Sequence, residues 1–371
     1  MNTFFMKPTI NFLGSTKEFC DAFEVGEGDL FFTSRHFYKD YLEQLELKCD
    51  FIFPKDYGKG EPTDELVEQI DKENNKENYK RIIGLGGGSV LDVAKFFVLD
   101  QITPILDLYD NKRDPKKARS LILVPTTCGT GSEVTSVSAM ALVSRSTKAG
   151  FGNPALFPDE AVLIPELLEN LPMEPFSTSA IDALVHAVEA TLSPKATPVG
   201  KVLSYEAIEL ILKGFKQIVV EGPEARKPLL KDFLYASTYA GVAFSNSGCA
   251  AVHALSYPLG GTFHVPHGES NYAMFTGVMK NYMEIKQDGE IAVLNKKMAD
   301  ILECDVETVY EKLEDLLNHL VQKKPLHEYG MTEAQITEFA DSVYEKQQRL
   351  LVNNFVPFDR DRIEKIYREL Y

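Results

Sequence analysis

Two segments of the chain concentrate residues that bind metal ions. Asp182 and His186 lie in the segment IDALVHAVEA. His253, His264 and His267 lie in the segment HALSYPLGGTFHVPHG. A single histidine is more often a packing residue than a ligand, but four histidines and an aspartate in two segments favour a metal site. Carboxylate and imidazole groups suit Fe²⁺, Zn²⁺, Mn²⁺ or Co²⁺, and the donor set alone does not choose among these ions.

The spacing of these residues limits how they can meet. Asp182 and His186 are four residues apart, which places them on one face of a helix. Apolar residues surround this pair, and a buried aspartate is costly unless it is paired or bound to a metal. His253 and His267 are expected on successive helices, and a turn at Gly260-Gly261 would have to bring them together.

A glycine-rich segment, GLGGGSVLDVAK (84–95), overlaps the end of a predicted strand. A strand followed by glycines and a helix aims backbone N–H groups and a helix N-terminus at a phosphate. Ser89 stands where the third glycine of G-x-G-x-x-G would be, so the segment is not the standard dinucleotide fingerprint. Ser89 could cap the helix and donate to a phosphate. A tight turn without a ligand is the alternative interpretation.

The segment PTTCGTGSEVT (125–135) follows another predicted strand and is rich in glycine and hydroxyl groups. Ligands bind at the carboxyl ends of strands in open α/β sheets. Two such loops together favour a nucleotide site over a pair of structural turns. Cys128 lies in this loop with no neighbouring base in the sequence, so we interpret it as a small packing residue.

The secondary structure that must position these residues is predicted to change along the chain, from alternating strands and helices to helices alone. Strands are predicted at 30–34, 51–53, 81–85, 121–124 and 161–164. Short apolar runs that alternate with helical segments are typical of a mostly parallel sheet. After residue 165, apolar residues recur at spacings of three and four, which indicates helices. We therefore predict an α/β domain over 1–165 and an all-helical domain over 166–371.

Composition narrows the function. Among 371 residues, 39 Lys and Arg face 55 Asp and Glu, for a net charge of −16. This charge argues against binding to nucleic acid or to an anionic membrane surface. Five scattered cysteines argue against a disulfide framework or a cysteine zinc site. With no apolar stretch of membrane-helix length and no signal-peptide pattern, we expect a cytoplasmic protein.

Taken in order, these motifs resemble the iron-containing alcohol dehydrogenase family over nearly the whole chain. The resemblance rests on the segments 86–95, 125–135, 181–190 and 253–268. Within the family, the segments 241–248 and 349–358 make the second half most similar to 4-hydroxybutyrate dehydrogenases. The resemblance implies a dehydroquinate synthase-like architecture, with an α/β nucleotide-binding domain followed by a helical metal-binding domain. It also implies self-association into a homo-oligomer.

The resemblance also implies roles for individual residues. One divalent metal, Fe²⁺ rather than Zn²⁺, would be held by Asp182, His186, His253 and His267. The pyrophosphate of the cofactor would lie against Gly86, Gly87, Gly88 and Ser89. The adenine and nicotinamide sides would be lined by Thr126, Thr127 and Thr130, with Thr135 and Lys148 nearer the nicotinamide ribose.

The sequence departs from the family pattern at two places. Many members carry an Asp at the end of the first strand, where this chain has Ser34 and Arg35. A missing carboxylate removes repulsion of a 2′-phosphate, but NAD(H) stays favoured over NADP(H) because the resembled subfamily mostly uses it. Where members often carry a proton-relay histidine, this chain has Tyr257, a poorer base at neutral pH. His264 could take that duty or merely pack.

The resemblance implies hydride transfer between a nicotinamide and a primary alcohol or aldehyde, with the metal as Lewis acid. The expected pair is 4-hydroxybutyrate and succinate semialdehyde, and its carboxylate needs a local cation such as Arg145, Lys148 or Lys201. The same chemistry on 1,3-propanediol, lactaldehyde or butanol is the alternative. A dehydroquinate synthase-like lyase would need a Glu-led ligand set, and a non-enzymatic binding module would need no metal.

Overall fold

The computed structural model describes residues 3–58, 60–74, 76–145 and 147–371, which form two compact units. One unit spans Met6–Leu171. The other contains Pro172–Tyr371 and the described residues before Met6. The sequence-based division after residue 165 therefore falls a few residues earlier and does not separate the N-terminal residues from the α/β domain.

The first unit is built on a parallel sheet with the strand order β1-β8-β5-β4-β2-β3. Its strands are β1 (Thr9–Phe12), β2 (Asp29–Phe32), β3 (Asp50–Ile52), β4 (Arg81–Gly86), β5 (Ser120–Pro125) and β8 (Glu160–Leu163). The five strands predicted from the sequence are present, and the α/β class is confirmed. The apolar runs of β4 and β5 are almost entirely buried, as expected for central strands covered on both faces. The strand β1 and a separate antiparallel hairpin, β6 (Val137–Leu142) and β7 (Thr147–Gly152), were not predicted.

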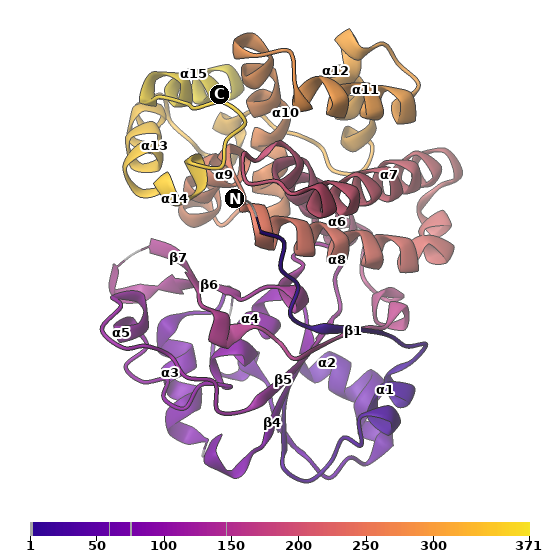
Figure 1. The fold of residues 1–371 in the computed structure, drawn as a ribbon, viewed down its shortest axis with the longest axis vertical. Coiled ribbons are helices and arrows are strands. Elements are labelled where there is room, and N and C mark those ends of the chain that lie inside the picture. The colour runs from indigo at the N-terminus through magenta and orange to yellow at the C-terminus, as the bar shows by residue number, and fades with distance from the viewer. Residues whose placement is uncertain (1–2, 59, 75, 146) are drawn as a thin grey trace. The chain divides into compact units, whose positions relative to one another are not determined.

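The α-helices of this unit are short. They are α1 (Thr16–Ala22), α2 (Arg35–Phe37), α3 (Asp64–Glu73), α4 (Gly88–Phe96) and α5 (Leu106–Tyr109). Helix α4 packs against β4 and β5, and its apolar residues join the core of the unit. It begins directly after β4, so the glycine-rich segment lies at the carboxyl end of a central strand (Figure 1).

The second unit is all-helical, as predicted. Its α-helices are α6 (Met173–Leu192), α7 (Pro198–Glu221), α8 (Leu230–Ser247), α9 (Ala251–Phe263), α10 (His267–Ile285), α11 (Glu290–Leu302), α12 (Val309–Asn318), α13 (Glu333–Lys346), α14 (Gln348–Leu351) and α15 (Arg360–Leu370). Helix α6 is central: it packs against α7, α8 and α10, and nearly all of its residues after Phe176 are buried (Figure 1). No helix in the described part of the chain is long and apolar enough to cross a membrane.

The link between α9 and α10 corrects one expectation. Gly260 and Gly261 do not form the turn but lie within α9, which ends at Phe263. A Cβ on Gly260 would lie at an ordinary contact distance of 3.4 Å from the carbonyl oxygen of Val265, and one on Gly261 would meet nothing within 4 Å. The chain reverses instead at His264, whose φ of 56° is left-handed.

Candidate metal and nucleotide sites

The four predicted metal ligands meet around one oxygen atom. Asp182 Oδ1 lies 4.0 Å from Nε2 of His186, 3.6 Å from Nε2 of His253 and 3.7 Å from Nε2 of His267. The side chains of Asp182, His186 and His253 are buried, whereas that of His267 is 34% exposed. The cluster therefore has a closed side and one side that a small molecule can reach.

Close packing of two helices makes this meeting possible. His267 is the first residue of α10, and Gly268 follows it. A Cβ on Gly268 would lie 2.0 Å from the carbonyl oxygen of Thr178 on α6, so only glycine allows the helices to approach this closely. Asp182 lies one turn beyond Thr178 on the same helix. The glycine after the ligand therefore brings His267 to Asp182.

Glu189 is a functional residue that the sequence reasoning missed. Its buried carboxylate accepts hydrogen bonds from Nδ1 of His253 at 2.7 Å and from the backbone N–H groups of Ala250 and Val252 at 2.8 and 2.6 Å. Because Nδ1 of His253 donates to Glu189, its Nε2 keeps a lone pair for a metal. A signal was present, since Glu189 follows His186 by three residues on one helix.

Asn271 shows that the donor set fits a cation. Its Nδ2 lies 2.7 Å from Asp182 Oδ1, 3.2 Å from His253 Nε2 and 3.3 Å from His267 Nε2. When both rings are neutral with Nε2 unprotonated, as a metal ligand must be, three acceptors converge on the two hydrogens of one amide nitrogen. The buried Oδ1 of Asn271 has no hydrogen-bond partner among the described residues. An O,N,N set with surplus lone pairs is the arrangement that a divalent ion satisfies.

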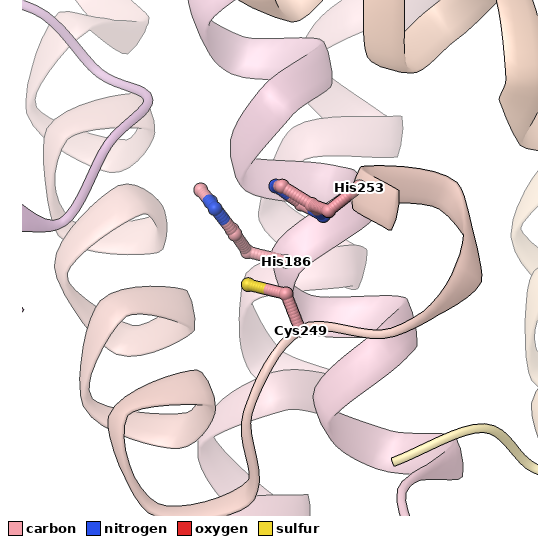
Figure 2. Close-up of side chains that lie close together, drawn as sticks. All are labelled: His186, Cys249 and His253. Carbon is pink, nitrogen blue, oxygen red and sulfur yellow. The ribbon is translucent and has the colours of Figure 1, made fainter. Parts of the chain in front are cut away.

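The ionisable groups of the cluster shift one another's pKa values. Burial alone would raise the pKa of Asp182, but His186, His267 and His253 hold that pKa well below its usual range. Cys249, also missed, lies beside His186 and His253 (Figure 2). Burial opposes ionisation of its thiol, but the two imidazoles outweigh burial and lower the pKa of Cys249 to about 7. The cluster thus holds negative charge on Asp182 at neutral pH.

The two proton-relay candidates lie in different surroundings. The ring centre of Tyr257 is 6.2 Å from that of His267, and its hydroxyl is 3.5 Å from Nη2 of Arg349. His264 is exposed at the end of α9. The geometry therefore puts Tyr257 beside the proposed ligands, whereas no described contact joins His264 to them.

The glycine-rich loop of the first unit has the form of a phosphate cradle. Helix α4 begins at Gly88, and its N-cap is Gly87, which offers no side-chain cap. The interpretation of Ser89 as the cap is wrong, because Ser89 lies inside the first turn. A Cβ on Gly86 would lie 2.6 Å from Val90, and one on Gly88 would lie 2.7 Å from Thr130 Cγ2. Bare backbone at a helix N-terminus suits a phosphate.

The threonine loop packs against this cradle, although not every hydroxyl faces it. Thr126 donates its backbone N–H to the carbonyl of Gly86 at 3.0 Å, and Thr127 lies 3.5 Å from a Cβ built on Gly87. Thr135 is buried, and its hydroxyl is held within the loop. The backbone of Lys148 pairs with Ala141 in the β6–β7 hairpin, while its side chain lies outside the described part of the structure.

Lys95, which the sequence reasoning did not single out, holds the threonine loop in place. Its ammonium group is fully buried and donates to Ser132 Oγ at 2.6 Å, to Thr135 Oγ1 at 3.1 Å and to the carbonyl of Val137 at 2.5 Å. Burial lowers the pKa of Lys95, while Asp92, 3.3 Å away, opposes this shift. Thr135 therefore serves as a partner of Lys95 in this structure.

Arg35, the departure at the end of β2, is paired. Its Nη2 lies 2.6 Å from Asp56 Oδ2, its Nε lies 3.0 Å from Asp56 Oδ1, and its guanidinium lies over the ring of Phe53. A bidentate pair of this kind satisfies the fork of the guanidinium. The positive charge of Arg35 is thus balanced by a carboxylate from the end of the neighbouring strand.

Comparison with known proteins agrees with this geometry. The model of the family "Iron-containing alcohol dehydrogenase" matches residues 14–165, and that of the "Fe-containing alcohol dehydrogenase family, C-terminal" matches residues 176–371. The chain belongs to the iron-containing alcohol dehydrogenase family. The resemblance inferred from four motifs is confirmed. As a member, the chain is a metal-dependent oxidoreductase that acts on CH–OH groups.

One relative is similar to this chain over nearly its whole length, and two solved structures share its fold. The chain is 47% identical to the 4-hydroxybutyrate dehydrogenase of Clostridium kluyveri, over 99% of both chains. It shares its fold with the sulfoacetaldehyde reductase of Bifidobacterium kashiwanohense in complex with NAD+, with a TM-score of 0.84 at 24% identity over 100% and 98% of the chains. It also shares its fold with a 1,3-propanediol oxidoreductase, with a TM-score of 0.82 at 23% identity over 100% of both chains.

Proposed function

We propose that this chain interconverts 4-hydroxybutyrate and succinate semialdehyde with NAD(H) and one Fe²⁺ ion. The observation that carries the proposal is the convergence of three imidazole nitrogens on Asp182 Oδ1. Asp182, His186, His253 and His267 would hold the ion. When bound, the ion acts as a Lewis acid on the reacting oxygen, and the nicotinamide exchanges a hydride with the adjacent carbon.

The substrate assignment rests on the full-length similarity to the C. kluyveri 4-hydroxybutyrate dehydrogenase. The cofactor assignment rests on the Arg35–Asp56 pair. A 2′-phosphate would have to compete with Asp56 for the guanidinium and would meet the repulsion of that carboxylate. NAD(H), which lacks this phosphate, meets neither obstacle.

The remaining roles follow from position. Gly86, Gly87, Gly88 and Ser89 would receive the pyrophosphate at the N-terminus of α4. Thr126, Thr127 and Thr130 would line the cofactor beside this loop, and Lys148 would lie near the nicotinamide ribose. Tyr257 is preferred over His264 as the proton relay, because its ring lies beside His267.

Replacement of His267 by alanine tests the metal assignment. The ligand is partly exposed, so the fold should tolerate the change, while bound Fe²⁺ and turnover of succinate semialdehyde should both be lost. His264→Ala, three residues away on the link, is the matched control and should keep its metal. Full activity in a metal-free His267→Ala protein would refute the proposal. Aldehydes assayed with NADH and with NADPH separate 4-hydroxybutyrate from 1,3-propanediol or butanol as the substrate.

A further inference from the structure

The guanidinium of Arg349 contacts Tyr257, and Tyr257 in turn contacts the proposed metal ligand His267. Its Nη2 lies 3.5 Å from the hydroxyl of Tyr257, and its Cζ lies 5.9 Å from the centre of the Tyr257 ring. That ring centre is in turn 6.2 Å from the ring centre of His267. Tyr257 therefore contacts both the cation and the partly exposed ligand of the cluster.

The charge of Arg349 is available to a ligand. The side chain is exposed, and no ion pair to Arg349 occurs among the described residues. The cations that the sequence suggested are already engaged where their side chains are described. Lys201 pairs with Glu290, and Arg145 pairs with Asp110 in the other unit.

The backbone of Arg349 is fixed relative to the cluster. It lies on the short helix α14, where the next two residues, Leu350 and Leu351, are buried. The side-chain amide of Asn353 donates to the carbonyl of Arg349 at 3.3 Å and to the carbonyl of Cys249 at 2.8 Å. Cys249 leads into α9 and lies beside His253. One amide thus links the segment that carries the cation to Cys249, which precedes the helix that carries His253.

We propose that Arg349 binds the carboxylate of the substrate and thereby selects short aldehydes and alcohols that carry a carboxylate at the opposite end. The inference rests on the proposed function, because it takes the reacting carbon to lie at the cluster of His267. The planar fork of a guanidinium matches a carboxylate, and it supplies a local positive charge for an anion in a chain whose net charge is −16.

Tyr257, which contacts both Arg349 and His267, offers a surface along which the substrate can lie. A substrate lying along Tyr257 would place its carboxylate at Arg349 and its oxygen-bearing carbon near the cluster.

The test compares two aldehydes of equal chain length, succinate semialdehyde and butanal, on the metal-loaded enzyme. Arg349→Met keeps an unbranched apolar stem but removes the charge. A hydrogen-bonded charged contact contributes roughly 1.5–3 kcal/mol, so we expect the KM for succinate semialdehyde to rise about 10- to 100-fold. The KM for butanal should stay unchanged, and any change in kcat that follows from the lost hydrogen bond to Tyr257 should be the same for both aldehydes. Arg349→Lys should recover part of the loss, and Arg368→Ala, at an exposed position on α15, controls for loss of an arginine.

The outcomes separate this inference from the proposed function. Wild-type enzyme that reduces butanal but not succinate semialdehyde would overturn the substrate assignment and leave Arg349 without a substrate to bind. Wild-type enzyme that reduces succinate semialdehyde, with an Arg349→Met variant that changes the KM for both aldehydes equally or for neither, would overturn the inference alone.

Discussion

Glu189 on helix α6 accepts a hydrogen bond of 2.7 Å from Nδ1 of His253 on helix α9. The same carboxylate receives two backbone N–H groups at the start of α9. It therefore fixes the tautomer and orientation of a proposed ligand and also caps the helix that carries it. Neither partner can shift without disturbing the other, so the ligand is positioned before any ion binds.

Loss of this carboxylate should weaken metal binding. In Glu189→Gln the side chain keeps a similar volume but loses its charge and one of its two acceptor oxygens. We expect the affinity for Fe²⁺ to fall about 10- to 100-fold, as is usual when an outer-shell partner of a ligand is changed. Titration in metal buffers measures the affinity. Glu174→Gln, at an exposed position on the same helix, should have no effect, and an unchanged affinity in Glu189→Gln would refute the assigned role.

Substitution of Gly88 should damage the cofactor site through one identifiable contact. The added methyl of Gly88→Ala would lie 2.7 Å from Thr130 Cγ2 and push the two loops apart. We expect the Kd for NADH to rise at least about tenfold, or about 1.4 kcal/mol. Thr130→Ser removes that methyl group, so the double variant should recover much of the affinity. A double variant no better than Gly88→Ala, measured by NADH fluorescence titration, would contradict the steric explanation.

Release of Arg35 should change the cofactor preference. In Asp56→Asn the guanidinium loses its balancing carboxylate. A 2′-phosphate could then pair with it without repulsion, so we expect kcat/KM for NADPH to rise relative to that for NADH. Steady-state rates with both cofactors measure the ratio. Adding Arg35→Ala should abolish the gain, and a gain that survives this second change would rule out Arg35 as its source.

Stability should decline at alkaline pH because buried acids resist ionisation. Burial, together with Asp21, raises the pKa of the Cys20 thiol to about 12 from an ordinary value near 9. Between these two values the unfolded chain releases a proton that the folded chain keeps, so the free energy of unfolding falls as pH rises.

One pKa unit corresponds to about 1.36 kcal/mol, so by pH 10.5 Cys20 accounts for up to about 2 kcal/mol of the decline. Urea denaturation at pH 8.5 and 10.5 measures it. Cys20→Ala lowers stability at both pH values, but it should reduce the difference between them. A difference as large as in the wild type would show that the thiol does not contribute. Part of the decline should persist, because burial also raises the pKa of Cys49 to about 12.

The sequence predicted those parts of the fold that rest on local apolar pattern. Central strands such as β4 and β5 are continuous apolar runs, and long helices such as α7 show regular spacing. The edge strand β1 was not predicted, because its side chains are half-buried or exposed and its apolar pattern is therefore weak. The turn expected at Gly260-Gly261 was wrong because α9 continues through both glycines to Phe263, and the chain reverses at His264 instead.

The ligand residues could be predicted because their types and motifs are specific, whereas their supporting residues depend on tertiary contacts. Glu189 and His253 are 64 residues apart in the sequence, and Tyr257 and Arg349 are 92 apart. The position of Glu189, three residues after His186, was a local signal for that residue, but no local pattern shows that it pairs with His253 or that Tyr257 meets Arg349. The same limit explains Thr135, whose hydroxyl looked available until the structure showed the buried ammonium of Lys95 beside it.

The contact of Gly268 with the carbonyl oxygen of Thr178 has a consequence for the choice of ion. Main-chain contact between α10 and α6 acts as a mechanical stop, so the helices cannot close further around a smaller cation. Side-chain rotation alone must then accommodate any difference in ionic radius, and the Nδ1 bond to Glu189 denies that freedom to His253. The rigidity of the scaffold would thus help to discriminate among divalent ions, in addition to the chemistry of the donor atoms.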